Sequence, residues 1–150
     1  MSDSHGNKQV LLQAVALESP NMILHLGDHD RDCYAIEDEY PRIPLRSVKG
    51  NCDFSSIGMD VDMFMLGGKR VFMTHGHVYR VKTGLSYLYN TAIDRGADIL
   101  LFGHTHMQHY DVTENLIAIN PGSISGQRKS YAVLEIKNGV VTCEMKVLAE

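Results

Sequence analysis

A short apolar run that ends in two histidines places the strongest constraint on this chain. Residues 99–102 are Ile-Leu-Leu-Phe, and Gly103-His104-Thr105-His106 follows directly. Such a run predicts a buried strand, and open α/β sheets hold their ligands beyond the carboxyl ends of strands. Because alternate residues of an extended segment point the same way, the two imidazoles are expected to face one metal site. Two unrelated loop histidines are the alternative.

The same kind of ending recurs along the chain. Asp28, Asn51 and His75 each follow a predicted strand, and Asp3 and His5 stand two residues apart near the start. The five positions 3, 28, 51, 75 and 104 recur about every 25 residues, roughly one strand and crossover. Singly, each has a structural explanation as a helix cap, a turn or a surface residue. Their joint occurrence at strand ends favours one common site.

The remaining pattern predicts a single α/β domain over residues 1–150. We expect helices at Lys8–Leu17 and Thr83–Arg95, and a final hairpin across Asn138-Gly139. Early βαβ units followed by strand-rich hairpins predict two sheets packed together with helices outside.

Composition and charge exclude several classes of protein. The net charge is −4 and no basic run is present, which argues against an extended nucleic-acid surface. The sequence shows neither an apolar run that predicts a membrane span nor a secretory signal. Three widely spaced cysteines argue against a disulfide framework and indicate a reducing cytoplasm.

The candidate ligands are two carboxylates, one amide oxygen and four imidazoles. This mixture suits Mn²⁺, Zn²⁺, Fe or Ni²⁺ better than Ca²⁺ or an iron–sulfur cluster. Seven ligands are too many for one tetrahedral ion and fit two ions that share a carboxylate. Two ions ~3.5–4 Å apart can hold the attacking and leaving oxygens at phosphorus and supply a bridging hydroxide as nucleophile. The pattern therefore predicts metal-assisted hydrolysis of a phosphate ester.

The ordered motifs resemble those of the calcineurin-like metallophosphoesterases, and in particular the small single-domain phosphodiesterases of the YfcE type. They are Asp3-x-His5, Gly27-Asp28, Gly50-Asn51-Cys52-Asp53, Thr74-His75-Gly76-His77 and Gly103-His104-Thr105-His106. The resemblance spans Ser2 to Val147. It implies a four-layer αββα sandwich of two mixed β-sheets flanked by helices, with a dinuclear metal centre.

The resemblance also implies a role for each ligand. One ion takes Asp3, His5 and His106, the other takes Asn51, His75 and His104, and Asp28 bridges them. Larger members of the family carry a histidine that serves as general acid at the position of Cys52. The alternative for Cys52 is a purely structural role as a small buried residue. Departure of the leaving group is then assisted by metal or water, or His77 serves as the general acid. Asp53 is expected to orient a neighbouring ligand.

The function expected from this resemblance is that of a cytoplasmic, Mn²⁺-dependent phosphodiesterase acting on small diesters. A phosphomonoesterase is one alternative, and a protein-interaction scaffold of the same fold, like the retromer subunit, is the other. Apolar residues expected in the 59–66 hairpin are compatible with a homodimer or homotetramer.

The resemblance further implies an apolar strand directly before Asp3, where only Met1 and Ser2 stand. The expectation is therefore a domain without its first strand, either as a truncated version of a longer chain or because the start lies at an internal methionine. That puts the first ion's site in question more than the second.

Overall fold

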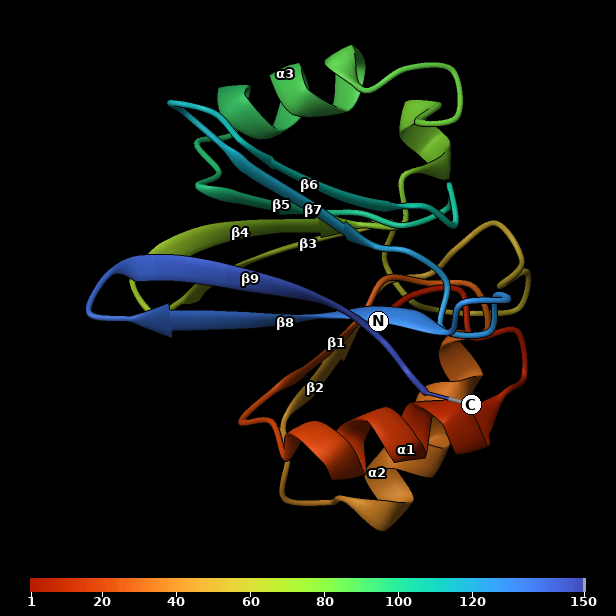
Figure 1. The fold of residues 1–150 in the computed structure, drawn as a ribbon. Coiled ribbons are helices and arrows are strands. Elements are labelled where there is room, and N and C mark those ends of the chain that lie inside the picture. The colour runs from red at the N-terminus through yellow and green to blue at the C-terminus, as the bar shows by residue number, and fades with distance from the viewer. Residues whose placement is uncertain (150) are drawn as a thin grey trace.

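The computed structural model describes residues 1–149, and Figure 1 shows its layers. The elements follow in the order α1 (Lys8–Glu18), β1 (Ile23–His25), η1 (Asp30–Asp32), α2 (Cys33–Glu39), β2 (Leu45–Ser47), β3 (Val61–Leu66), β4 (Lys69–Thr74), η2 (His77–Tyr79), α3 (Ser86–Asp94), β5 (Ile99–Leu101), β6 (Gln108–Val112), β7 (Ile117–Pro121), β8 (Ser130–Lys137) and β9 (Val140–Val147).

The strands form one five-stranded mixed sheet and two strand pairs. The larger sheet has the order β3-β4-β5-β7-β6, in which β4, β5 and β7 are parallel neighbours. The parallel pair β1-β2 and the antiparallel pair β8-β9 form the facing layer. Helix α3 covers the outer face of the larger sheet, whereas α1 and α2 cover the opposite side (Figure 1). The predicted fold class is confirmed, with the difference that the second sheet consists of two pieces.

Met1 and Ser2 are hydrogen-bonded to β1 on one side and to the loop before β8 on the other. The Met1 amino group donates to the carbonyl of Leu24 at 2.8 Å, and the Leu26 N–H donates to the Met1 carbonyl at 2.9 Å. On the other side, the Ile124 N–H donates to the Ser2 carbonyl at 3.0 Å. The start of the chain is thus hydrogen-bonded on both sides, which fixes the residues that lead into Asp3.

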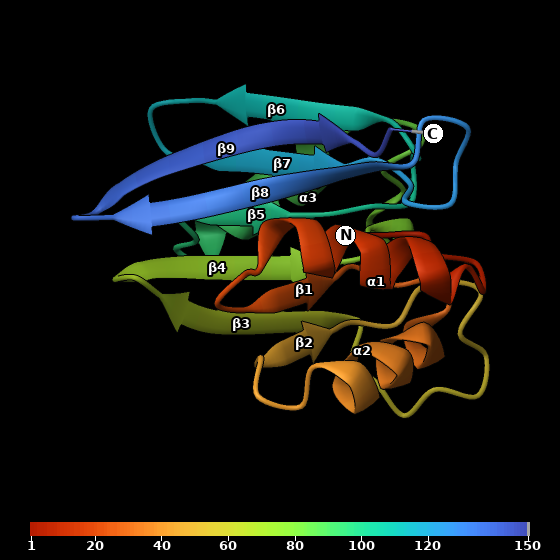
Figure 2. The same ribbon diagram turned by 60° about the horizontal axis from the view of Figure 1, so that its bottom comes forward.

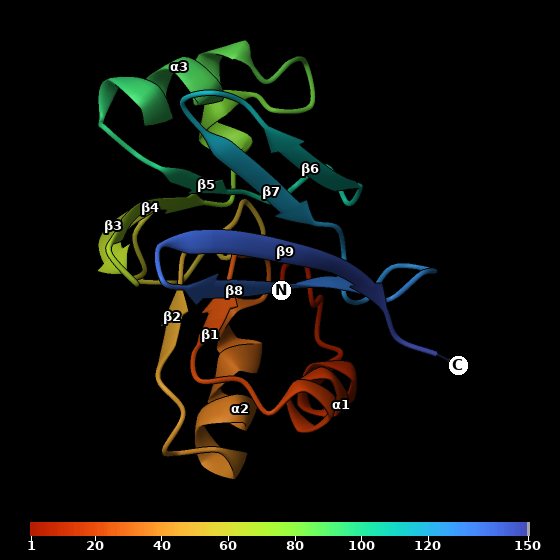
Figure 3. The same cartoon turned by 60° about the vertical axis from the view of Figure 1, so that its left-hand side comes forward.

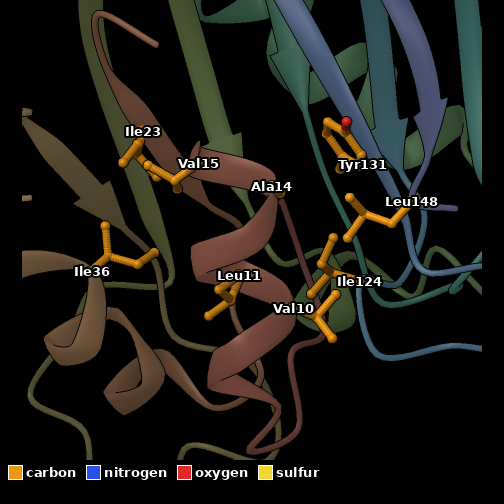
Figure 4. Close-up of a cluster of buried hydrophobic side chains, with 9 residues drawn as sticks. All are labelled: Val10, Leu11, Ala14, Val15, Ile23, Ile36, Ile124, Tyr131 and Leu148. Carbon is orange, nitrogen blue, oxygen red and sulfur yellow. The ribbon is translucent and has the colours of Figure 1, made fainter. Parts of the chain in front are cut away.

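Apolar side chains fill the spaces between the layers. Under α1, Leu11 and Ile36 are fully buried and pack with Ile124 in one cluster, drawn in Figure 4. A second cluster lies between the two strand layers and includes Met73 and Ile99. Three-residue strands such as β1 and β5 form few backbone hydrogen bonds with their neighbours. Apolar packing on both faces therefore holds them in place.

The local predictions agree with the structure apart from small shifts. The final hairpin turns at Asn138 and Gly139, which both have positive φ. The helix expected from Thr83 begins at Ser86, because the Thr83 hydroxyl and N–H both bond the Arg80 carbonyl in a turn. In residues 1–149, no helix has the length and apolar character needed to cross a membrane.

Candidate metal centre

The predicted ligands meet where the strands end, on loops that turn sharply. Asp3, His5, Asp28, His104 and His106 all have positive φ, a conformation that residues other than glycine rarely adopt. Such backbone strain is found mainly at functional sites, where the surrounding contacts maintain it. Figure 2 shows the loops that follow β1, β2, β4 and β5 gathered at one end of the molecule.

Asp3, His5, Asp28 and His106 form the first group of ligands. One ligand atom from each lies within 4.8 Å of the others. The His106 Nε2 atom is 3.0 Å from Asp3 Oδ1, and the His5 Nε2 atom is 4.0 Å from the same oxygen. Asp3 and Asp28 are buried and the two histidines are exposed, so the group opens to solvent on its imidazole side.

Asn51, His75 and His104 form the second group, centred on the buried His75. The His75 Nε2 atom lies 3.1 Å from Asn51 Oδ1, and the ring centroids of His75 and His104 are 5.0 Å apart. The His75 Nδ1–H donates to the Leu26 carbonyl at 2.7 Å. In the neutral ring this leaves a lone pair on Nε2 that faces the other ligands.

Asp28 lies between the two groups, with one oxygen turned toward each. Its Oδ2 is 3.9 Å from His5 Nε2, and its Oδ1 is 3.5 Å from His75 Nε2. Burial alone would raise the pKa of this carboxyl, but the N–H of Cys52 and the imidazole of His75 lower it below its ordinary value. The carboxylate is therefore ionised at neutral pH.

The unpaired acceptors at this site fit divalent cations. Asp3 Oδ1 is buried and has no hydrogen-bond partner within residues 1–149. The His75 Nε2 atom lies 3.1 Å from Asn51 Oδ1 and 3.5 Å from Asp28 Oδ1. Buried acceptors that face one another are unfavourable unless a cation lies among them. The oxygen and nitrogen donors present suit Mn²⁺, Zn²⁺, Fe or Ni²⁺.

Asp53 connects the loops that carry Asp28 and Asn51. Its Oδ2 accepts the N–H of Asp28 at 3.0 Å and of Gly50 at 2.7 Å, and its Oδ1 accepts the N–H of Asp30 at 3.0 Å. Its role in orienting a neighbouring ligand stays a prediction.

Asp32 and Asn120 also hold ligand loops, and the sequence analysis does not assign this role to either residue. Asp32 Oδ2 accepts the Ser4 hydroxyl at 2.7 Å and the Gly6 N–H at 2.8 Å, and so holds the loop around His5. The Asn120 side chain donates to the Gly103 carbonyl and to the Thr105 hydroxyl, on the loop that carries His104 and His106. Asp32 stands in an acidic stretch without a distinctive pattern, and the Asn-Pro-Gly-Ser signal at Asn120 reads equally well as a simple turn.

The candidate proton donors lie at the edge of the second group. The His77 ring is 5.5 Å from that of His75 and 6.1 Å from that of His104. Burial and the neighbouring His75 lower the pKa of His77, and burial lowers that of His104 to about 4. Burial and the Asp28 carboxylate raise the pKa of the Cys52 thiol, which therefore stays protonated.

Comparison with known proteins identifies the family. The family model described as the calcineurin-like phosphoesterase superfamily domain matches residues 1–139. The chain belongs to this superfamily. It is 35% identical over 150 residues to the probable metallophosphoesterase YsnB of Bacillus subtilis strain 168, covering 95% of this chain and 85% of that one.

Other matches agree with this assignment. The phosphodiesterase YfcE of Escherichia coli K12 is 29% identical over 101 residues, covering 59% of this chain and 51% of YfcE. The crystal structure of a predicted phosphoesterase from Streptococcus pneumoniae TIGR4 matches with a TM-score of 0.79 and 26% identity, covering 98% of this chain and 86% of that one. The zinc complex of Vps29 from Entamoeba histolytica shares the fold, with a TM-score of 0.70 and 21% identity over 93% of this chain and 88% of its own.

Proposed function

We propose that the protein is a phosphodiesterase that works with two divalent metal ions. The observation that carries this proposal is the position of Asp28, whose two carboxylate oxygens are turned toward two separate groups of ligands. Asp3, His5 and His106 would hold the first ion. Asn51, His75 and His104 would hold the second, with Asp28 shared between the two. Two ions in such a site supply a hydroxide nucleophile at neutral pH and offset the negative charge that develops at phosphorus.

The residues of the chain prepare the site for this task before any substrate arrives. The hydrogen bond from His75 Nδ1 to the Leu26 carbonyl fixes the ring so that Nε2 faces the second ion's position. With a pKa of about 4, His104 is neutral at neutral pH and keeps a lone pair free for a metal. The Asp53 carboxylate accepts the backbone N–H groups of Asp28 and Gly50 and so holds the Asp28 and Asn51 loops together.

His77 would bind the substrate phosphate from the edge of the second group. Because its pKa is lowered, the neutral ring predominates near pH 7, and the role that fits is donation of an N–H hydrogen bond to a phosphoryl oxygen. Protonation of the leaving group would then come from water. Cys52 contacts Asp28 through its backbone N–H, and its high thiol pKa makes it a poor proton donor at neutral pH.

We infer a small phosphodiester as the substrate. The name of the similar E. coli protein, phosphodiesterase YfcE, supports a diester. The exposed imidazoles of His5 and His106 leave the metal positions accessible from solvent, which suits a small substrate. Mn²⁺ is the proposed ion, and Zn²⁺, Fe and Ni²⁺ suit the same donors. A cytoplasmic location and a homodimer or homotetramer stay predictions.

The test is hydrolysis of bis-p-nitrophenyl phosphate compared with p-nitrophenyl phosphate, with and without added Mn²⁺. Wild-type protein is expected to cleave the diester faster than the monoester, and only with metal. Asp28→Asn removes the charge that the two ions would share and is expected to abolish turnover. Asp38→Asn makes the same change on the exposed surface of α2 and serves as the control. Metal-independent turnover, or faster monoester cleavage, would contradict the proposal.

A catalytically inactive scaffold is the second candidate, because Vps29 structures share this fold. Turnover distinguishes the two, since a Vps29 structure with this fold also holds zinc. Absence of turnover in a protein that has bound its metal would favour the scaffold.

A further inference from the structure

A buried histidine contacts the loops of the first group of ligands without belonging to that group. His25 ends β1, which lies between the helices α1 and α2 and the five-stranded sheet (Figure 3), and its side chain is fully buried. A buried polar ring is unfavourable unless its nitrogens have hydrogen-bond partners. Those of His25 have theirs on the two loops that carry Asp3, His5 and Asp28.

The contacts of the His25 ring determine which of its nitrogens carries the proton. The Gly27 N–H donates to His25 Nδ1 at 3.3 Å, so this nitrogen is the acceptor. In the neutral ring the proton is then on Nε2, which donates to the Ser4 hydroxyl oxygen at 3.1 Å. This tautomer is the opposite of that of His75, whose Nδ1–H donates to the Leu26 carbonyl. His25 thus has no lone pair free for a metal, and its role is to hold other groups.

Ser4 extends this contact to Asp32. Because Ser4 Oγ accepts from His25, its own proton is free, and the nearest acceptor is Asp32 Oδ2 at 2.7 Å. The same Asp32 oxygen accepts the Gly6 N–H at 2.8 Å. We call His25, Ser4 and Asp32 the His25 network. Within residues 1–149, none of the three has a buried side-chain nitrogen or oxygen without a partner. A fully paired buried network of this kind is rigid and specifies one geometry.

The two residues bonded to the ring are immediate neighbours of strained ligands. Ser4 stands between Asp3 and His5, whose φ angles are 56° and 44°. Gly27 precedes Asp28, whose φ is 60°. Such conformations persist only where surrounding contacts maintain them. The hydrogen bonds to the ring therefore act at the points where the first group of ligands requires support.

Other contacts hold the second group of ligands. His75 is fixed by its hydrogen bond to the Leu26 carbonyl, and Asp53 holds the loop that carries Asn51. Neither contact passes through the His25 network. A change at His25 should therefore affect the first group of ligands more than the second.

We propose that His25 is a positioning residue that prepares the first group of ligands for its metal ion. Its Nδ1 atom holds the loop that leads to Asp28. Its Nε2–H, through Ser4, holds the loop that carries Asp3 and His5. The inference rests on the proposed two-metal function, because the first ion is one of the two.

The test compares variants of His25 by titration calorimetry with Mn²⁺. Wild-type protein is expected to bind two ions. His25→Leu keeps an apolar volume but no hydrogen-bonding group, and should weaken one of the two sites ~10–100-fold. The other site should stay within about threefold of wild type. His25→Gln can place an amide N–H near the position of Nε2 and should recover most of the lost affinity.

Two further variants separate positioning from stability. Ser4→Ala keeps the ring and breaks the network, so it should weaken the same site as His25→Leu. Ile23→Ala removes buried apolar contacts from the same strand without changing these hydrogen bonds, and should bind both ions as wild type does. Anomalous maps of Mn²⁺-soaked His25→Leu crystals identify the weakened site, where the peak beside His106 should be lost and the peak beside His75 retained.

NMR of the ring nitrogens in the metal-free wild-type protein tests the network without any variant. At neutral pH the proton of His25 is expected on Nε2 and that of His75 on Nδ1. A proton on His25 Nδ1 would overturn the proposal. Equal losses of affinity in His25→Leu and His25→Gln would also do so, because the ring would then only fill space.

The calorimetry distinguishes this proposal from the function on which it rests. Fewer than two ions in the wild-type protein would contradict the two-metal function and this inference with it. Two ions in wild type, bound equally well by His25→Leu, would overturn the role of His25 alone.

Discussion

The carboxylate of Asp53 accepts the backbone N–H of Asp28 at 3.0 Å, although the two residues lie on different loops. Asp28 has a φ of 60°, which is strained for an aspartate and persists only when its surroundings maintain it. The hydrogen bond from its N–H provides part of that support. The geometry of Asp28, between the two ligand groups, therefore depends on Asp53, which is not itself a proposed ligand.

Asp53→Asn is expected to weaken metal binding. An amide turns an NH₂ group toward one of the backbone N–H groups that the carboxylate now accepts, so the Asp28 and Gly50 loops lose a contact. Changes to groups that orient ligands typically lower metal affinity ~10–100-fold. Titration calorimetry with Mn²⁺ would measure this, with the exposed Asp38→Asn as the control. Equal affinities for the two variants would refute the role of Asp53.

Gly50→Ala tests the close approach of the two ligand loops. A Cβ atom at Gly50 would overlap both the carboxylate and the backbone nitrogen of Asp28. The loops must then separate, and we expect loss of Mn²⁺ binding together with a lower Tm. Gly126→Ala is the matched control, because a Cβ there meets the side chain of Ser123 at an ordinary 3.4 Å. If both variants bind metal equally well, the close packing of the loops is unimportant.

His77→Gln separates substrate binding from metal binding. If His77 donates a hydrogen bond to the phosphoryl group, its loss should lower kcat for the diester ~100-fold. Mn²⁺ affinity should stay within about threefold, since His77 is not among the proposed ligands. His109→Gln on β6, where the ring contacts Tyr89, is the control. A parallel loss of metal affinity would instead make His77 a ligand.

Acid should destabilise the metal-free protein through His25. Burial, reinforced by the nearby N-terminal amino group, lowers the pKa of this histidine from 6.5 to about 3. Below pH 6.5 the unfolded chain therefore takes up a proton that the folded chain rejects, so the stability contributed by neutral His25 is lost as the pH falls toward 3. The slope approaches ~1.4 kcal/mol per pH unit at most. Urea unfolding between pH 7 and 4 would measure it, and a His25→Gln variant with the same slope would contradict this assignment.

The sequence was informative about the site because its signals are local. Each apolar run gives way to a polar ligand at a glycine or threonine, and parallel strands bring such ends together. That is why Asp28, His75 and His104 were expected at one edge, and the structure places them there. Only their role as metal ligands stays a prediction.

The contacts that hold the ligand loops could not be predicted from the sequence, for a physical reason. Asp32 and Asn120 support ligand loops that are distant in sequence, through contacts formed only in the folded chain. An isolated acid or amide has the same local appearance whether it holds a loop or is merely solvated. The division of the second sheet is likewise a tertiary result, since within residues 1–149 β8 pairs only with β9.

The most direct test of the two-metal proposal is a crystal structure of the Mn²⁺-soaked protein with anomalous data collected at the manganese edge. Two peaks ~3.5–4 Å apart are expected. Asp28 should lie between them, His106 should contact one, and His75 should contact the other. A single peak, or two peaks without Asp28 between them, would contradict the proposed centre.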